Sequence, residues 1–183
     1  MIDFINVLID KDAAYVANGN VLFRVKSFKN YGILSERIIQ EQDSGSRVDV
    51  ETYKEDPNDF TLWKPSTDDE PGWDSPWGLG RPGWHLECSV MSEIVLGVPF
   101  DIHGGGNDLK FPHHDNEIAQ TCAYHSNESA ESFAKYWFHN GFLNLDNEKM
   151  SKSLGNVVYI DDLNKNFKVN EICLALFSTH YRQ

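Results

Sequence analysis

The chain has 183 residues, with 16 Lys and Arg against 28 Asp and Glu, so its formal net charge is −12 when histidine is neutral. Hydrophobic residues make up 40% and aromatic residues 13% of the sequence, which is enough for a packed core and excludes wholesale disorder. No apolar run approaches the roughly 20 residues that a membrane-spanning helix needs. Because so acidic a chain repels nucleic acid on average, a polynucleotide partner would have to meet a local basic patch or another part of a larger protein.

The number of cysteines indicates the kind of cellular compartment in which the protein occurs. The three cysteines, Cys88, Cys122 and Cys173, are a sparse and odd set. Such a set argues against a disulfide scaffold and favours a reducing compartment. The N-terminus also lacks the basic and then apolar layout of a secretory signal. The sequence therefore predicts a cytoplasmic protein without a membrane partner.

The first third of the chain predicts a helix, a turn and two strands. Apolar residues recur at helical spacing from residue 3, which predicts a helix over residues 3–17. Asn18-Gly19-Asn20 predicts a turn, and the apolar run behind it predicts a strand over residues 21–25. A polar stretch with a loop at residues 43–46 follows, and a second strand is predicted over residues 60–64.

Residues 65–82 differ in composition from the rest. They hold four of the seven prolines together with Trp73 and Trp77. Such a segment cannot form a regular helix or a central strand. Since flexible linkers seldom carry tryptophan, we expect an ordered loop packed on the surface.

After residue 83 helices and strands alternate. Apolar spacing predicts a helix over residues 86–95 that stops at Gly97, and then a short buried strand over residues 98–103 that ends in three glycines. A second helix is predicted from residue 111 to 124. The last predicted strands cover residues 136–139 and 142–145. This alternation indicates an α/β fold with a parallel sheet.

Three residues form a candidate metal site. His113 and Glu117 are four residues apart on a predicted helix, so both side chains can lie on one side of it. Cys88, on another predicted helix, could approach them, and a thiolate, an imidazole and a carboxylate are donors that suit zinc. His114 is a competing ligand on the same helix. Equally, Cys88 could belong to the core and the His/Glu pair could lie on a solvated helix face.

A glycine-rich stretch forms a candidate nucleotide site. His103, Gly104, Gly105, Gly106, Asn107 and Asp108 follow a predicted strand. Consecutive glycines let the backbone approach a ligand closely, at the carboxyl end of the sheet where α/β proteins bind nucleotides. Asp108 could then accept hydrogen bonds from ribose hydroxyls. The alternative is a tight turn without a ligand.

A lysine-rich stretch, residues 148–156, is a candidate phosphate site. Lys149 and Lys152, with two serines and a glycine, could gather around phosphates and offset the charge that develops on a leaving pyrophosphate. The alternative is a solvated surface loop.

Several stretches of this sequence resemble the cysteinyl-tRNA synthetases, a family of class I aminoacyl-tRNA synthetases. Lys-Met-Ser-Lys-Ser at residues 149–153 is similar to the second class I signature. The other stretches that carry the resemblance follow in the family's order, at residues 73–78, 81–89, 101–109 and 111–117. The resemblance covers essentially the whole chain and is weakest before residue 60.

The resemblance implies an α/β fold, namely the second half of a Rossmann-type catalytic domain with part of a connective insertion. Residues 1–62 would belong to the insertion and residues 63–147 to the catalytic half. Residues 148–183 would hold the signature loop and the start of a helical region that contacts the tRNA stem.

The resemblance also implies a reaction and its site. Cys88, His113 and Glu117 would hold one catalytic zinc ion together with a further cysteine, and Trp84 would line the substrate pocket. His103, the three glycines and Asp108 would bind ATP, while Lys149 and Lys152 would act in catalysis, Lys152 in contact with ATP. L-Cysteine would be activated with ATP and Mg²⁺ to the adenylate and then transferred to tRNA(Cys).

The implied zinc would explain how cysteine is told from serine. The two amino acids differ only at S against O, which is too little for a shape-reading pocket to reject strongly. A soft zinc–thiolate bond, and the easier ionisation of a thiol, separate them without an editing site.

The sequence departs from the family in one important respect. The first class I signature, His-x-Gly-His, does not occur, and neither Cys122 nor Cys173 stands where the fourth zinc ligand belongs. We therefore expect an internal piece of a longer enzyme, inactive alone, whose partners include the N-terminal and C-terminal parts. Two alternatives remain: a non-catalytic zinc- or nucleotide-binding module, and a ligase that joins cysteine to an amino-sugar.

Overall fold

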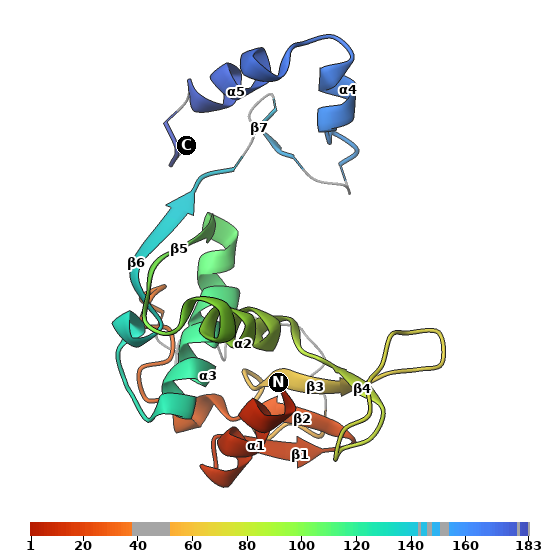
Figure 1. Cartoon of the computed structure of the whole chain (residues 1–183), viewed down its shortest axis with the longest axis vertical. Coiled ribbons are helices and arrows are strands. Elements are labelled where there is room, and N and C mark those ends of the chain that lie inside the picture. The colour runs from red at the N-terminus through yellow and green to blue at the C-terminus, as the bar shows by residue number, and fades with distance from the viewer. Residues whose placement is uncertain (38–51, 143, 146–147, 151–153, 179, 183) are drawn as a thin grey trace. The chain divides into compact units, whose positions relative to one another are not determined.

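The computed structural model describes residues 1–37, 52–142, 144–145, 148–150, 154–178 and 180–182 (Figure 1). These residues form two compact units. The first comprises residues 1–103 and 109–137, and the second comprises residues 104–108 and 138–183. The loop expected at residues 43–46 lies outside the described residues. Among those that are described, no helix is long and apolar enough to cross a membrane.

The chain begins with helix α1, Ile2–Asp10, which buries Phe4, Ile5 and Leu8. The helix was expected to continue to residue 17, and this expectation is wrong. Asp12 takes a positive φ of 58°, and the chain then enters strand β1, Ala14–Ala17. Pairing with the next strand, a contact that helical periodicity does not reveal, decides the structure of this segment.

A four-stranded antiparallel sheet follows, in the order β1-β2-β3-β4. β2 spans Asn20–Phe23, β3 Phe60–Pro65 and β4 Gly80–Pro82, so both strands predicted in this region are confirmed. Asn18 and Gly19 connect β1 to β2 with φ angles of 49° and 76°. Positive φ at both positions gives the tight hairpin turn for which Asn-Gly is favoured.

The proline-rich segment is ordered, as expected. Trp73 forms a two-way backbone bridge with Gly80, and the Trp77 ring packs 6.0 Å from that of buried Trp63. A Cβ at Gly80 would lie only 2.4 Å from Trp63 Nε1, so this position must stay a glycine for the indole to pack here. The segment ends in β4, an edge strand that tolerates Pro82.

Two helices build the region that carries the candidate metal residues. α2 spans Trp84–Leu96 and ends at Gly97, whose φ is 73°, so the predicted stop is confirmed. α3 spans Asp115–His125 and follows an irregular helical turn, Lys110–His114. The side-chain amide nitrogen of Gln120, in α3, donates to the hydroxyl oxygen of Ser89 and to the backbone carbonyl oxygen of His85, each at 2.6 Å. Both acceptors belong to α2, so these hydrogen bonds tie the two helices together.

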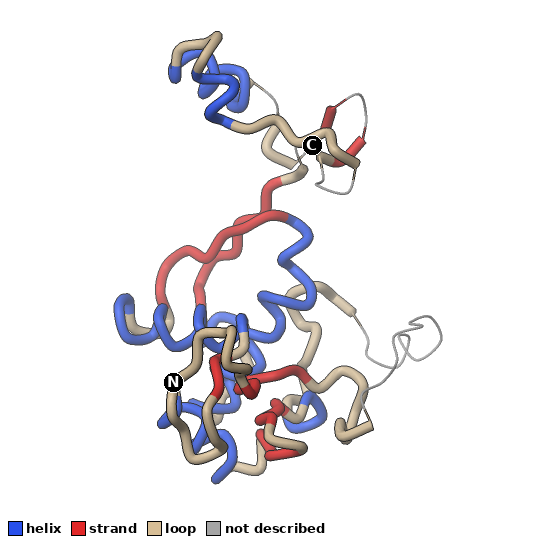
Figure 2. The backbone as a smooth tube through the Cα atoms, turned by 90° about the vertical axis from the view of Figure 1, so that its right-hand side faces the viewer, coloured by secondary structure: helices blue, strands red, loops and turns tan. Residues whose placement is uncertain are grey.

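Strands β5 (Phe100–Gly106) and β6 (Ala134–Asn140) lie side by side (Figure 1; Figure 2). Phe100 N donates to Phe133 O, and a Cβ at Gly104 would lie 3.3 Å from Phe138 O. Because the contacts advance together along both strands, β5 and β6 are parallel, whereas the largest sheet is antiparallel. The three glycines were expected after the strand; they belong to β5 itself, and the chain turns only at Asn107–Leu109.

Four further elements are described in the second unit. Strands β7, Asn144–Leu145, and β8, Glu148–Lys149, form a short antiparallel pair, and β7 falls in the strand expected near residues 142–145. Helices α4, Ile160–Asn164, and α5, Val169–Phe177, follow. The expected division at residues 62/63 and 147/148 into insertion, catalytic half and signature region stays a prediction.

Candidate metal and substrate site

The three candidate metal residues meet in the first unit. Cys88 comes from α2, His113 from the turn before α3, and Glu117 from the first turn of α3. Their potential ligand atoms all lie within 4.8 Å of one another, and His113 and Glu117 are buried. His113 was expected inside the helix with Glu117; it precedes the helix, but the turn keeps its imidazole next to the carboxylate.

The Glu117 carboxylate is fully buried and lies between two imidazoles. Its Oε2 is 2.7 Å from His103 Nε2 in a hydrogen bond, and its Oε1 is 3.1 Å from His113 Nε2. Burial on its own would raise the pKa of Glu117, but the two histidines outweigh burial and lower that pKa to about 2. Glu117 is therefore ionised at neutral pH.

The geometry around Glu117 Oε1 fits a metal ion. This oxygen is buried and, among the described residues, has no hydrogen-bond partner of acceptable geometry, although His113 Nε2 is 3.1 Å away. Ligand atoms about 2.0–2.3 Å from one tetrahedral zinc ion lie roughly 3–4 Å apart, so a short N···O approach without a hydrogen bond suits two donors to one ion. The sulfur, nitrogen and oxygen donor set also suits zinc.

The Cys88 thiol needs a cation in order to act as a ligand. Burial, followed by the charge of Glu117, raises the pKa of Cys88 to about 12, so the free thiol is protonated at neutral pH. A bound divalent ion inverts this preference, because it stabilises the thiolate directly. Cys88 would therefore be a thiolate at neutral pH only with a metal bound.

His85 supports His113 from the far side. The two Nδ1 atoms are 2.8 Å apart, which leaves His113 Nε2 directed at Glu117. Burial, followed by the charge of His113, lowers the pKa of His85 to about 4, so His85 is neutral at pH 7. A hydrogen-bonding partner on the second ring nitrogen is how ligating histidines are usually oriented.

His114 and His103 form a second group with Glu117. Their potential ligand atoms also lie within 4.8 Å of one another, and the two imidazole rings are 4.7 Å apart. His114, considered from the sequence as a competitor to His113, is thus grouped with His103 and not with Cys88. Sequence reasoning assigned His103 to nucleotide binding only and missed its hydrogen bond to Glu117, for which a separation of 14 residues gives no periodic signal.

Trp84 presents an aromatic surface beside this cluster. Its indole stacks on His113 with ring centroids 4.0 Å apart and an interplanar angle of 26°. The side chain is nevertheless 58% exposed. An exposed indole in contact with a candidate metal ligand can hold the apolar part of a small substrate.

The candidate nucleotide residues lie at the end of β5. Gly104, Gly105 and Gly106 are strand residues, and Asp108 is exposed in the turn that follows. A Cβ at Gly106 would lie 2.6 Å from Asp108 Oδ1, so the missing side chain lets the carboxylate fold back over the backbone. Residues 104–108 belong to the second unit.

The lysine-rich stretch is described only in part. Lys149 lies in β8, where its backbone pairs with that of Asn144. Lys152 lies outside the described residues. Their expected roles at the phosphates stay predictions.

Comparison with known proteins identifies the family of this chain. A sequence model of the family described as tRNA synthetases class I (C) catalytic domain matches residues 1–183. The chain therefore belongs to the class I tRNA synthetases, whose catalytic domain is Rossmann-like, and the expected α/β class is confirmed.

The curated relatives are more specific. The chain is 54% identical over 184 residues to a cysteine–tRNA ligase of Phenylobacterium zucineum, 56% identical over 184 residues to one of Pelagibacter ubique, and 55% identical over 183 residues to one of Saccharophagus degradans. Each match covers 100% of this chain but only 39%, 40% and 39% of the respective relative. The chain thus spans about two fifths of their length.

The half-buried, neutral His85 predicts that stability depends on pH. Its pKa is about 4 in the folded chain against an ordinary value of 6.5, so the unfolded chain takes up the proton first as the pH falls. The stabilising contribution is present above pH 6.5 and is lost as the pH falls from 6.5 towards 4. We expect the wild-type chain to lose about 2 kcal/mol more than His85→Asn between pH 7 and pH 5.

Urea denaturation at the two pH values, with a chelator present, measures this difference. Asparagine can keep a polar group near His113 Nδ1 but does not titrate, so it is the matched variant. An equal pH dependence in both proteins would contradict the assignment.

Proposed function

We propose that this chain is the metal-binding part of a cysteine–tRNA ligase, which joins L-cysteine to tRNA(Cys) at the expense of ATP. The observation that carries the proposal is the cluster of half-buried Cys88 with buried His113 and Glu117, on which the exposed indole of Trp84 stacks through His113. The three curated relatives described above, each named a cysteine–tRNA ligase, support it over the amino-sugar ligase and the non-catalytic module.

Cys88, His113 and Glu117 would hold zinc, with a fourth ligand from outside this chain. When bound, the ion would supply a soft Lewis acid that binds the thiolate of substrate cysteine. The residues of this chain would prepare the site. Glu117 stays ionised between its histidines, His85 orients His113, and Trp84 covers the imidazole and keeps water from one side of the amino acid.

The nucleotide would be held by other residues. We assign His103, Gly104, Gly105, Gly106 and Asp108 to binding of the adenosine. The glycines of β5 have no side chains, so the ligand can approach the strand backbone closely. The Asp108 carboxylate would accept hydrogen bonds from the ribose hydroxyls. Lys149 and Lys152 would contact the phosphates, and ATP would bring Mg²⁺ with it. Their ammonium groups would offset the charge that gathers on the leaving pyrophosphate.

The reaction then needs no nucleophile from the protein. A carboxylate oxygen of cysteine attacks the α-phosphorus of ATP, and the bond to pyrophosphate breaks. A hydroxyl of the terminal tRNA ribose next attacks the acyl carbon, and AMP leaves. Positioning and charge stabilisation supply the rate. A ligase of this kind works in the compartment where amino acids are joined to tRNA. The cytoplasmic location of this chain stays a prediction.

Zinc binding tests the assigned ligands without any activity assay. After dialysis against limiting zinc, we expect Cys88→Ser to retain less than about a tenth of the wild-type metal, because a hydroxyl is a far poorer donor than a thiolate. Cys173→Ser makes the same chemical change on exposed helix α5 and should retain the wild-type amount. Metal content is read by atomic emission. Equal zinc in both variants would refute Cys88 as a ligand.

Cysteine-dependent exchange of pyrophosphate into ATP tests the proposed activity. We would assay the chain alone and mixed with the first half of the catalytic domain of one of its cysteine–tRNA ligase relatives. We expect exchange only in the mixture, driven by cysteine and not by serine. Lys152→Ala should lower the rate on the order of 10²-fold or more, as expected for loss of one transition-state contact, whereas Lys165→Ala should not.

The outcomes of the exchange assay separate the hypotheses. Exchange by the chain alone would show that the first class I signature is dispensable. Folded protein without exchange in either sample would favour the non-catalytic module. Transfer of cysteine to an amino-sugar in place of tRNA would favour the other ligase.

A further inference from the structure

Residues 31–37, which we call the strap, pack against the segment that carries two of the candidate metal ligands. That segment, residues 110–117, comprises the irregular turn Lys110–His114 and the start of α3. The strap and the segment belong to the same compact unit, and the residues that join them by hydrogen bonds are 81 and 85 positions apart in sequence. None of the roles proposed above uses the strap.

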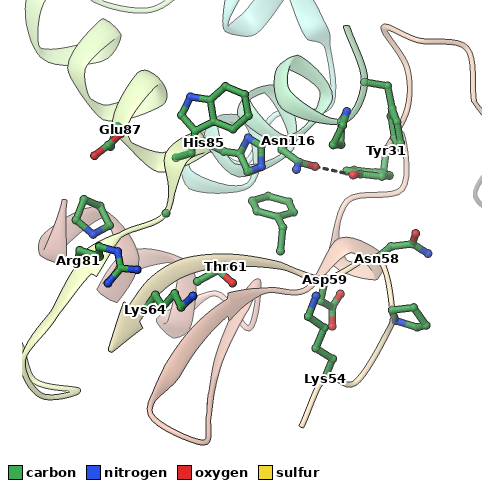
Figure 3. A pocket seen from close by; sticks show the side chains of 17 residues that line it. Tyr31, Lys54, Asn58, Asp59, Thr61, Lys64, Arg81, His85, Glu87 and Asn116 are labelled. Atoms are coloured by element: carbon green, nitrogen blue, oxygen red, sulfur yellow. Dashed lines mark hydrogen bonds between the residues drawn. The ribbon is translucent and has the colours of Figure 1, made fainter. Parts of the chain in front are cut away.

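Tyr31 anchors the first end of the strap. Its side chain is buried, and its hydroxyl donates to Asn116 Oδ1 at 2.5 Å (Figure 3). Its ring meets that of Phe111 edge-on, with ring centroids 6.2 Å apart and an interplanar angle of 73°. One side chain therefore holds a residue that precedes His113 and the residue directly before Glu117.

The middle of the strap provides a donor to a buried carboxylate. Asp115 lies between the two candidate ligands in the sequence and is only 1% exposed. Its Oδ1 accepts from the backbone nitrogen of Leu34 at 3.0 Å. Because a buried carboxylate that loses a donor is costly, this hydrogen bond favours the observed conformation of the segment.

The far end of the strap covers Phe111. The Arg37 guanidinium carbon lies 4.4 Å from the centre of the Phe111 ring, within the range of a cation–π contact. Arg37 N also donates to Gly32 O at 3.2 Å, which folds the strap back on itself. Gly32 has a positive φ of 85°, and a Cβ there would lie 2.4 Å from Arg37 O, so this fold requires glycine.

These contacts act where local structure leaves the segment least constrained. Phe111 is extended, with φ −137° and ψ 134°, inside an otherwise helical turn. At the other end, α3 begins without a side-chain hydrogen bond from its N-cap residue, His114. The backbone around His113 is therefore held by the strap, while its imidazole is held by His85.

We propose that the strap is a positioning element of the metal site: it holds residues 111–116 so that His113 Nε2 and Glu117 Oε1 meet at one ion. The inference rests on the proposed function, because it takes these two residues as zinc ligands. The strap acts on them through the segment and supplies no ligand itself. Loss of a strap contact should therefore weaken zinc binding more than an equivalent loss elsewhere in the unit.

The zinc affinity of Tyr31→Phe, compared with a matched control, tests the proposal. Phenylalanine removes the hydroxyl and keeps the ring beside Phe111. Tyr15→Phe removes the same atom from a hydroxyl that donates to Asp59 Oδ2 at 2.7 Å, away from the ligand segment in sequence. In competition with a chelating dye, we expect Tyr31→Phe to bind zinc on the order of tenfold more weakly, the lower end of the roughly 10–100-fold cost of removing a group that supports a ligand. Tyr15→Phe should bind zinc as the wild-type chain does.

Urea denaturation of the metal-free proteins separates positioning from general stability. Each variant loses one hydrogen bond from a tyrosine hydroxyl, so the two urea midpoints should fall by similar amounts. Wild-type zinc affinity in Tyr31→Phe, or equal weakening of zinc binding in both variants, would overturn the proposal.

Two substitutions at Asp115 give an independent readout. Both remove the charge, but Asp115→Asn keeps an oxygen that can accept from Leu34 N, whereas Asp115→Ala does not. We expect zinc binding to be on the order of tenfold weaker in Asp115→Ala than in Asp115→Asn. Equal zinc affinity in these two variants would contradict the role of the strap alone. Failure of the wild-type chain to bind zinc would instead contradict the proposed metal site, and with it the proposed function.

Discussion

The buried carboxylate of Glu117 is the constraint on which the site depends. A charge with no solvent exposure is costly unless hydrogen bonds or opposite charges surround it. His103 satisfies one oxygen, and the second oxygen faces His113 and the Cys88 thiol without a hydrogen bond of its own. Because these partners come from β5, from the turn before α3 and from α2, one side chain links three elements. A divalent ion shared with Cys88 and His113 would complete the compensation.

The layer around these residues limits how they can move. His85 fixes the direction of His113, Gln120 ties α2 to α3, and Trp84 closes over the imidazole. Trp84 also lines a pocket of about 730 Å³ beside the cluster, and Lys54 and Lys64 stand in the wall of that pocket (Figure 3).

Local signals predicted part of this structure. Periodicity and Gly97 gave α2 and its end, Asn18-Gly19 gave the hairpin turn, and the four-residue spacing of His113 and Glu117 brought the right pair together although His113 precedes the helix. Long-range contacts escaped prediction. The end of α1 is set by strand pairing, and the His103–Glu117 bond joins a strand to a helix. The pocket is lined by four segments that are distant in sequence, so no single motif predicts it.

X-ray absorption at the zinc edge of the zinc-loaded chain tests the central claim most directly, because it counts sulfur donors at the metal. We expect one sulfur ligand at about 2.3 Å, with nitrogen and oxygen donors completing the site. Addition of L-cysteine should raise the sulfur count by one, whereas L-serine should leave the spectrum unchanged. A sulfur count that stays the same with cysteine, or that is already zero without it, would contradict a cysteine-selecting metal site built on Cys88, His113 and Glu117.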